Sequence, residues 1–129
     1  MARERSWDIL AVIALGGGLG SVARHLLAQA IPTAPGGFPW ATFLTNVSGC
    51  LVLAVLMVYV LEVWPPSRYV RPFFGVGFLG GFTTFSTFTV EILRTGQPVV
   101  YAAASLAAGL AAVWGGFALA RLLSRRERT

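Results

Sequence analysis

One stretch of eleven residues, from Gly80 to Val90, combines residue types that an ordinary membrane-spanning helix avoids. It reads Gly-Gly-Phe-Thr-Thr-Phe-Ser-Thr-Phe-Thr-Val, so two adjacent glycines precede five hydroxyl side chains. Each glycine weakens a helix by roughly 1 kcal/mol relative to alanine. Helix-breaking, hydroxyl-lined backbone at membrane depth is tolerated only where protein buries it or where it lines a watery cavity. The stretch therefore predicts a binding site or a permeation path for a small polar species.

Neutral hydrogen-bond donors occur both in this stretch and in the spans around it. An anion that crosses a bilayer must replace its hydration shell, and conduction requires weak, successive sites. Amide and hydroxyl groups suit this task better than arginine, which would hold the anion too tightly to release it. The candidate donors are Asn46, Ser86, Thr87, Tyr101 and Ser105.

Two phenylalanines in the stretch, Phe85 and Phe88, are three residues apart and so share one side of a helix. The edge of an aromatic ring is positive while its face is negative, so ring edges can help to solvate an anion. Hydrophobic packing is the commoner role of phenylalanine and stays open on spacing alone. The flanking hydroxyl residues favour an ion path.

Two ionisable residues, Arg24 and Glu91, lie inside predicted spans. Inserting such a residue into a membrane helix costs about 2.5–3.5 kcal/mol, so a residue that is kept there is a functional candidate. Both lie near the end of a span, so snorkelling or a mutual salt bridge is an alternative to direct contact with an ion. For Arg24 we expect a structural role. For Glu91 we leave open a pore vestibule and a structural hydrogen-bond acceptor.

The elements that must position these residues are membrane-spanning helices. Hydrophobic residues make up 56% of the 129 residues and charged residues 12%, whereas about a quarter of a soluble domain is charged. A helix crosses the hydrocarbon core with about 20 residues. We therefore predict an all-α membrane protein, a single domain over 1–129 with four spans at about 7–31, 38–63, 72–95 and 98–123.

Small or polar residues recur at helical spacing in each span, as Gly16, Gly20 and Arg24 do in the first. Small residues at intervals of four let helices approach closely, and we assign Gly20 that structural role. Close packing does not account for Asn46 or Ser105. Four short helices also have too little mutual surface to bury all of these stripes, so we expect a homo-oligomer.

The ten basic residues are all arginines, and they are unevenly divided between the two ends of the spans. Eight lie near the termini or in the second loop, and two, Arg24 and Arg94, lie at the opposite end. The positive-inside rule then favours a cytoplasmic location for both termini. The basic tail over 121–128 has no interleaved aromatic residues. We interpret it as a topology determinant or an anionic-lipid contact and expect no nucleic-acid partner.

Three segments, in order along the chain, resemble the signatures of the Fluc/CrcB family of fluoride channels. They are GGLGSVAR at 17–24, TFLTNVSGC at 42–50 and GFLGGFTTFSTF at 77–88. The third is specific, because a GGxTTFSTF run in a four-span chain of this size is hard to find elsewhere. The resemblance covers all four spans.

The resemblance implies a passive channel that exports cytoplasmic fluoride across a bacterial or archaeal plasma membrane. It implies an antiparallel, dual-topology dimer with two pores, so the partners are fluoride, membrane lipid and a second copy of the chain. It also implies a central structural sodium ion, held by the backbone carbonyls of Gly80 and Thr83 at a break in the third helix. The family's first-span arginine falls on Arg24. Its pore positions fall on Asn46, Phe85, Ser86, Thr87, Phe88, Glu91, Tyr101 and Ser105.

Two features depart from the family pattern. His25 follows Arg24 where an aromatic residue is commoner, which we treat as minor. The uneven division of arginines matters more, because insertion in both orientations works best with little bias. A paired, oppositely oriented homologue is therefore the alternative to a homodimer.

Three other classes of protein fit four spans. A small dual-topology multidrug transporter needs a titratable carboxylate within its first span, and no Asp or Glu occurs between Ile9 and Ile31. A membrane enzyme lacks candidate groups, since His25 and Cys50 are the only residues of their types. A non-catalytic membrane subunit explains the glycine stripes but not Asn46 beside a hydroxyl run.

Overall fold

The computed structural model of the chain describes residues 4–129, and the regular elements in that range are all helices. Four helical stretches are long and apolar enough to cross a membrane. This confirms the predicted all-α membrane fold with four spans. The stretches are Ser6–Ala30, Trp40–Val63, Arg71–Arg94 and Pro98–Glu127.

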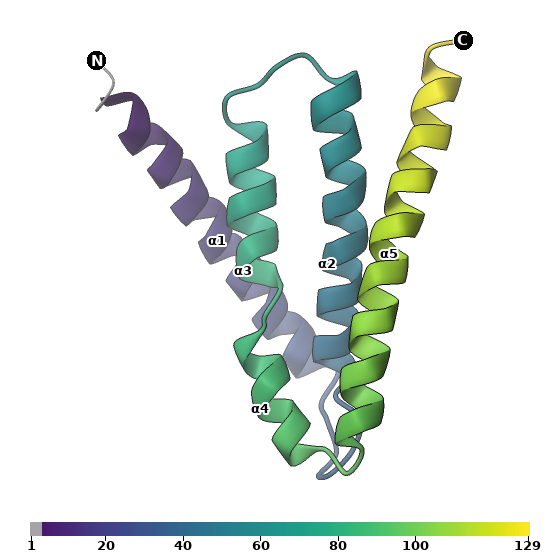
Figure 1. The fold of residues 1–129 in the computed structure, drawn as a ribbon. Helices are drawn as coiled ribbons and strands as arrows, with labels where there is room; N and C mark the ends of the chain where they lie inside the picture. The colour runs from purple at the N-terminus through teal and green to yellow at the C-terminus, as the bar shows by residue number, and fades with distance from the viewer. Residues whose placement is uncertain (1–3) are drawn as a thin grey trace.

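Three of the spans are continuous helices. The first is α1 (Glu4–Ala30) and the fourth is α5 (Pro98–Glu127). The second is α2 (Trp40–Val58), which runs on into the π-helical turn η1 (Tyr59–Val63). In Figure 1 the start of α1, the end of α5 and the second loop lie at one end of the molecule, and the other two connections lie at the opposite end.

The third span is interrupted. It consists of η2 (Arg71–Leu79), the short α3 (Gly80–Phe82), a non-helical stretch at 83–85 and α4 (Ser86–Arg94). Figure 1 shows the ribbon losing its coil between α3 and α4. The third helix is therefore broken at membrane depth, as the sequence predicts.

The break begins at Thr83, the last residue of the predicted Gly80–Thr83 break, and the glycine pair itself is helical. Gly80 has φ −62° and ψ −37°, whereas Thr83 is extended with ψ 158°. Gly81 serves close packing instead, because a Cβ on it would overlap the carbonyl of Gly17 on α1, whereas a Cβ on Gly80 would meet no atom within 4 Å. Small residues thus set where the helices cross, and the break follows a few residues later.

The same close approach extends along the crossing of α1 and the third span. A Cβ on Gly16 would overlap the backbone of Phe73, and one on Gly20 would overlap the carbonyl of Phe78. Small residues at helix–helix contacts let backbones pack closely in membranes. Gly20 therefore lies where any larger residue would push α1 away from the third span.

The other long contact joins α2 to α5, which run side by side in Figure 1. Here a Cβ on Gly116 would meet the side chain of Ala54 and the backbone of Leu51 at 2.8 Å. Few large side chains are fully buried, and the largest are Tyr101, Val58 and Thr45. A single chain thus leaves most of its apolar surface to lipid or to a partner.

Candidate functional site

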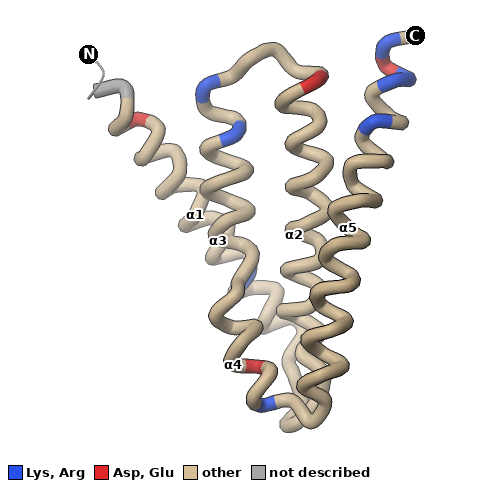
Figure 2. Tube along the Cα trace, viewed as in Figure 1, with Lys and Arg blue, Asp and Glu red and all other residues tan. Residues whose placement is uncertain are grey.

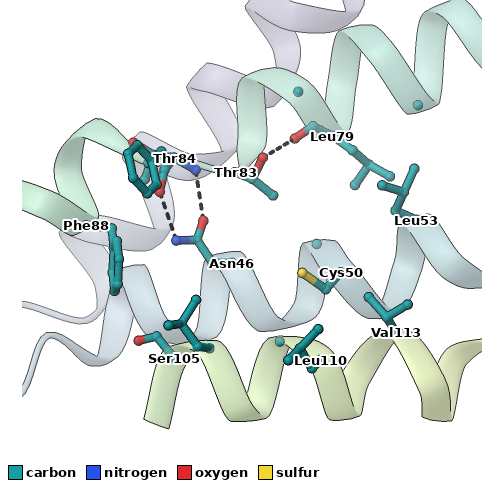
Figure 3. A pocket seen from close by; sticks show the side chains of 16 residues that line it. Asn46, Cys50, Leu53, Leu79, Thr83, Thr84, Phe88, Ser105, Leu110 and Val113 are labelled. Carbon is teal, nitrogen blue, oxygen red and sulfur yellow. Dashed lines mark hydrogen bonds between the residues drawn. The ribbon is translucent and has the colours of Figure 1, made fainter. Parts of the chain in front are cut away.

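Asn46 on α2 holds the backbone of the break through two hydrogen bonds. Its Nδ2 atom donates to the Thr84 carbonyl oxygen at 2.9 Å, and the Thr84 N–H donates to Asn46 Oδ1 at 2.8 Å (Figure 3). A buried backbone group without a partner costs about 1–3 kcal/mol. The Asn46 amide therefore replaces bonds that the helix gives up at this point. One of its two N–H groups is left for another acceptor.

The break withholds helical N–H donors from a run of carbonyls over 80–83, and Gly80 and Thr83 are two of them. In an α-helix the Thr84 N–H would bond to the oxygen of Gly80, and the Thr87 N–H to the oxygen of Thr83. Instead, the Thr84 N–H donates to Asn46, and the Thr87 N–H donates to the Thr84 hydroxyl at 3.2 Å. The Gly80 and Thr83 oxygens are thus free of their helical donors. Neutral carbonyl oxygens of this kind suit a hard cation such as sodium.

No side-chain cluster competes for a metal in the part of the chain that the structure describes, where no group of three His, Cys, Asp or Glu residues is close enough to hold one. The Thr83 hydroxyl donates to the Leu79 carbonyl at 2.9 Å and so stays beside the break.

A cavity of about 490 Å³ lies beside the break, between α2, the third span and α5. Figure 3 shows the Asn46–Thr84 pair at one end of it and leucine and valine side chains at the other. Six of the predicted site residues line it: the pore candidates Asn46, Phe85, Phe88 and Ser105, and the sodium-site candidates Gly80 and Thr83. The fold therefore brings neutral donors and aromatic rings from three different spans to one space.

Ser105 is the one lining residue of this cavity whose buried hydroxyl lacks a partner among residues 4–129. Its Oγ atom is shielded from solvent and makes no hydrogen bond. Buried polar atoms are nearly always satisfied by protein, water or a ligand. The fold therefore leaves a buried hydroxyl without a partner beside the cavity.

The two phenylalanines differ in how firmly they are held. Phe88 is buried, and its ring centroid lies 5.2 Å from that of Tyr101. Phe85 is 76% exposed in the single chain. The two rings are 6.0 Å apart at an interplanar angle of 41°. Phe88 thus belongs to the packed wall, and Phe85 projects from the break toward the surface.

Glu91 connects three spans on the other side of the break. Its Oε1 atom accepts from the Thr42 hydroxyl at 2.9 Å, and its Oε2 atom accepts from the Tyr101 hydroxyl at 2.8 Å. Tyr101 is fully buried. In the single chain Glu91 is a structural hydrogen-bond acceptor, one of the two roles left open from the sequence. The Tyr101 hydroxyl is committed to it.

A second hollow of about 300 Å³ lies beside Glu91, and Arg24, Thr42 and Thr87 also line it. The Arg24 Nε atom is buried without a hydrogen-bond partner among the described residues. The ion pairs found over residues 4–129 do not join Arg24 to Glu91, so the mutual salt bridge considered from the sequence is not formed. Arg24 instead turns a positive group toward this hollow.

The predicted hydroxyl residues are thus distributed over both sides of the break. Ser105 lies on the larger cavity, Thr87 on the smaller hollow, and Ser86 is exposed on α4, with its Oγ atom 3.5 Å from that of Thr84. The sequence reasoning did not assign a role to Thr42 or Thr84. The signal available for Thr42 was its place, with Asn46, in the polar stripe of the second span.

The fold and the site define a class: a multi-pass membrane protein whose third helix is broken beside a cavity lined by neutral donors and phenylalanines. The sequence model of one family, described as "CrcB-like protein, Camphor Resistance (CrcB)", matches residues 11–117. The chain belongs to the CrcB family.

Relatives with curated names support this family assignment. A protein of Streptomyces avermitilis named "Fluoride-specific ion channel FluC 3" is 54% identical over 127 residues, covering 93% of this chain and 62% of the relative. A second from that organism, named FluC 2, is 53% identical over 116 residues, covering 81% of this chain and 73% of the relative. One from Nocardia farcinica, also named FluC 2, is 50% identical over 119 residues, covering 88% and 85%. These relatives are named as channels, in agreement with the prediction that the chain is not an enzyme.

Proposed function

We propose that this chain is a passive, fluoride-selective channel. The observation that carries the proposal is the cavity beside the break, where Asn46, Phe85, Phe88 and Ser105 meet without any charged side chain among the lining residues. The relatives named as fluoride-specific channels support fluoride as the ion.

The chemistry of the cavity suits a small, strongly hydrated anion. The unpaired Ser105 hydroxyl and the remaining N–H of Asn46 replace water as donors. The ring edges of Phe85 and Phe88 add weak positive potential. Because these groups are neutral, each holds the ion weakly enough for it to move on. The exposed Ser86 and half-buried Thr87 extend a polar surface beside this step, and Glu91 and Tyr101, which are hydrogen-bonded to each other, support the packing behind it.

We further propose that two chains assemble antiparallel, with two pores at their interface. The large share of apolar surface that one chain leaves uncovered, including Phe85, supports a partner at the cavity face. The arginine bias argues for a single orientation and hence for an inverted homologue as the alternative partner. Labelling a cysteine placed in the C-terminal tail, with Cys50→Ala, tests this: label reaching it from both sides of intact cells supports the homodimer. Label from one side alone, with no flux from the purified chain, would contradict it.

A central sodium ion completes the proposal. Antiparallel pairing brings two breaks together at the midplane, so the freed carbonyls of Gly80 and Thr83 from both chains would face one cation. Bound there, the ion would supply a fixed positive potential for nearby anions. Each chain's part is to present two of the four oxygens, with the hydrogen bonds between Asn46 and Thr84 holding the backbone open.

The proposed setting is the bacterial plasma membrane. Fluoride enters from acidic surroundings as neutral HF, dissociates in the more alkaline cytoplasm and is trapped there as the anion. A passive pore lets the membrane potential drive the anion out. The direct test is ion efflux from liposomes that contain only this chain. Rapid fluoride efflux without chloride efflux is expected, and equal efflux of both ions would contradict the proposal.

A further inference from the structure

A basic hollow of about 320 Å³ lies at the end of the molecule where α5 ends, remote from the break. It is lined by Glu62 at the end of the second span, by Arg121, Ser124 and Arg125 of α5, and by Arg128, the residue that directly follows α5. The last four follow helical i, i+3, i+4 and i+7 spacing, and Arg128 keeps helical backbone angles, so they share one face. Figure 2 shows the basic residues gathered at this end of α5.

The hollow has more positive charge than its one carboxylate neutralises. Three arginines and one glutamate line it, so its net charge is +2. The ion pair inside it is loose, with Arg121 Nη2 and Glu62 Oε1 3.6 Å apart and the two side chains 59% and 45% exposed. Exposed pairs of this kind contribute about 0–1 kcal/mol. An anion can therefore compete for Arg121.

The other two arginines have different surroundings. Arg128 donates to the backbone carbonyl of Glu62, which joins the end of α5 to the end of the second span and fixes one side of the hollow. Arg125 has no side-chain hydrogen bond or ion pair among the described residues. The hollow thus presents one free guanidinium between two that are partly held.

The position of the hollow matches the boundary between hydrocarbon and headgroups. Arg121 is near the end of the predicted fourth span, and its guanidinium lies 5.9 Å from the centroid of the Phe117 ring. Phe117 and Trp114, one and two turns before Arg121 on the same face of α5, are 36% and 77% exposed. Long arginine side chains at a helix end keep their stems in the apolar layer and their heads at the interface. An acyl chain along these two aromatic side chains would lead to a headgroup in the hollow.

We propose that this hollow binds the phosphodiester headgroup of an anionic phospholipid. Guanidinium groups hold phosphate oxygens in bidentate, charge-assisted hydrogen bonds, and basic pockets at the cytoplasmic ends of spans bind acidic lipid headgroups. Arg125 supplies the free contact, and Arg121 exchanges its loose contact with Glu62 for a phosphate oxygen. The site is separate from the cavity beside the break and does not depend on which ion the protein conducts.

The test is native mass spectrometry of the full chain in detergent, titrated with palmitoyl-oleoyl phosphatidylglycerol and, separately, with the matching phosphatidylcholine. We expect retention of phosphatidylglycerol only. Arg125→Gln should weaken its apparent Kd about fivefold, and Arg121→Gln with Arg125→Gln by about 25-fold, from the ~1 kcal/mol that each lost hydrogen bond to the phosphate contributes. The masses in the same spectra report whether each variant keeps its assembly.

Arg126→Gln is the matched control, because it removes the same charge from the next residue, which does not line the hollow. It should leave the Kd unchanged. A loss equal to that of Arg125→Gln would mean that diffuse tail charge, not a site, attracts lipid. Equal retention of phosphatidylcholine would overturn the proposal. Displacement of the bound lipid by millimolar inorganic phosphate would contradict the proposal, because it would show that the hollow binds a free anion and not a phospholipid.

Discussion

The two sides of the broken third span use polar groups in opposite ways. On the smaller hollow, the carboxylate of Glu91 is occupied at both oxygens, by Thr42 and Tyr101. On the larger cavity, the buried hydroxyl of Ser105 has no partner and Phe85 is exposed. The first arrangement holds three spans together. The second leaves the Ser105 hydroxyl free to donate a hydrogen bond to a bound ion.

This difference indicates where to look for the ion. A paired group has already satisfied its hydrogen-bonding capacity, and an ion must displace its partner to reach it. An unpaired buried group carries a penalty of about 1–3 kcal/mol that a bound ion can relieve. Arg24, whose Nε atom is also unpaired, is the exception on the smaller side. We therefore expect the ion to pass the larger cavity and the Glu91 bridge to support the fold.

Removing the cation should have the largest effect, because it would disturb both sides of the break at once. If the Gly80 and Thr83 carbonyls face a sodium ion, exhaustive sodium removal should abolish fluoride efflux from liposomes. Lithium should restore it poorly, since a cage set by backbone geometry fits one ionic radius. Undiminished efflux in sodium-free vesicles would show that the freed carbonyls need no cation.

Replacing Phe85 or Phe88 should reduce fluoride efflux nearly as much, and it tests only the side of the break with the larger cavity. Phe85→Ile and Phe88→Ile keep apolar bulk but remove the polarised ring edge. We expect fluoride efflux to fall on the order of 100-fold, equivalent to about 2.7 kcal/mol, while the protein still assembles. Phe38→Ile, which removes a ring that packs on Tyr101 but does not line the cavity, is the control. Normal fluoride efflux in both variants would indicate that Phe85 and Phe88 serve only as hydrophobic packing residues.

Substitution of Asn46 separates its contact with Thr84 from contact with the ion. Asn46→Asp keeps an acceptor for the Thr84 N–H but adds negative charge, whereas Asn46→Ser is neutral and too short to keep either bond. If Asn46 faces the anion, flux should fall about tenfold further in the aspartate variant, a difference of about 1.4 kcal/mol. Parallel thermal unfolding checks stability. A serine variant that conducts no better than the aspartate variant would identify the residue as a support for the break only.

The fold was predictable because it depends on local composition. Four long apolar stretches identify four spans with no knowledge of their contacts. The exact start of the break was not predictable. It depends on Asn46, 38 residues away from Thr84, and glycines that weaken an isolated helix also suit a close helix crossing. The sequence alone does not show whether a glycine pair breaks its helix or lets two helices pack closely.

The candidate site was predictable in its residue types but not in its pairing. The polar stripes of the second, third and fourth spans mark Asn46, Glu91 and Ser105 as unusual. Helical spacing within one span does not say which residue of another span it faces. Only the packed structure shows that Glu91 meets Thr42 and Tyr101 while Ser105 meets no partner.

The comparison of the two sides is tested most directly by removing one hydroxyl from each. Ser105→Ala deletes the unpaired hydroxyl, and Thr42→Ala deletes a paired one, with fluoride efflux and thermal unfolding measured on both. We expect Ser105→Ala to lower efflux several-fold at unchanged stability. Thr42→Ala should lower the unfolding free energy by about 1–3 kcal/mol while the folded protein keeps its efflux. The reverse pattern, with Ser105→Ala silent in flux and Thr42→Ala blocking it in folded protein, would contradict the account and move the ion path to the Glu91 side.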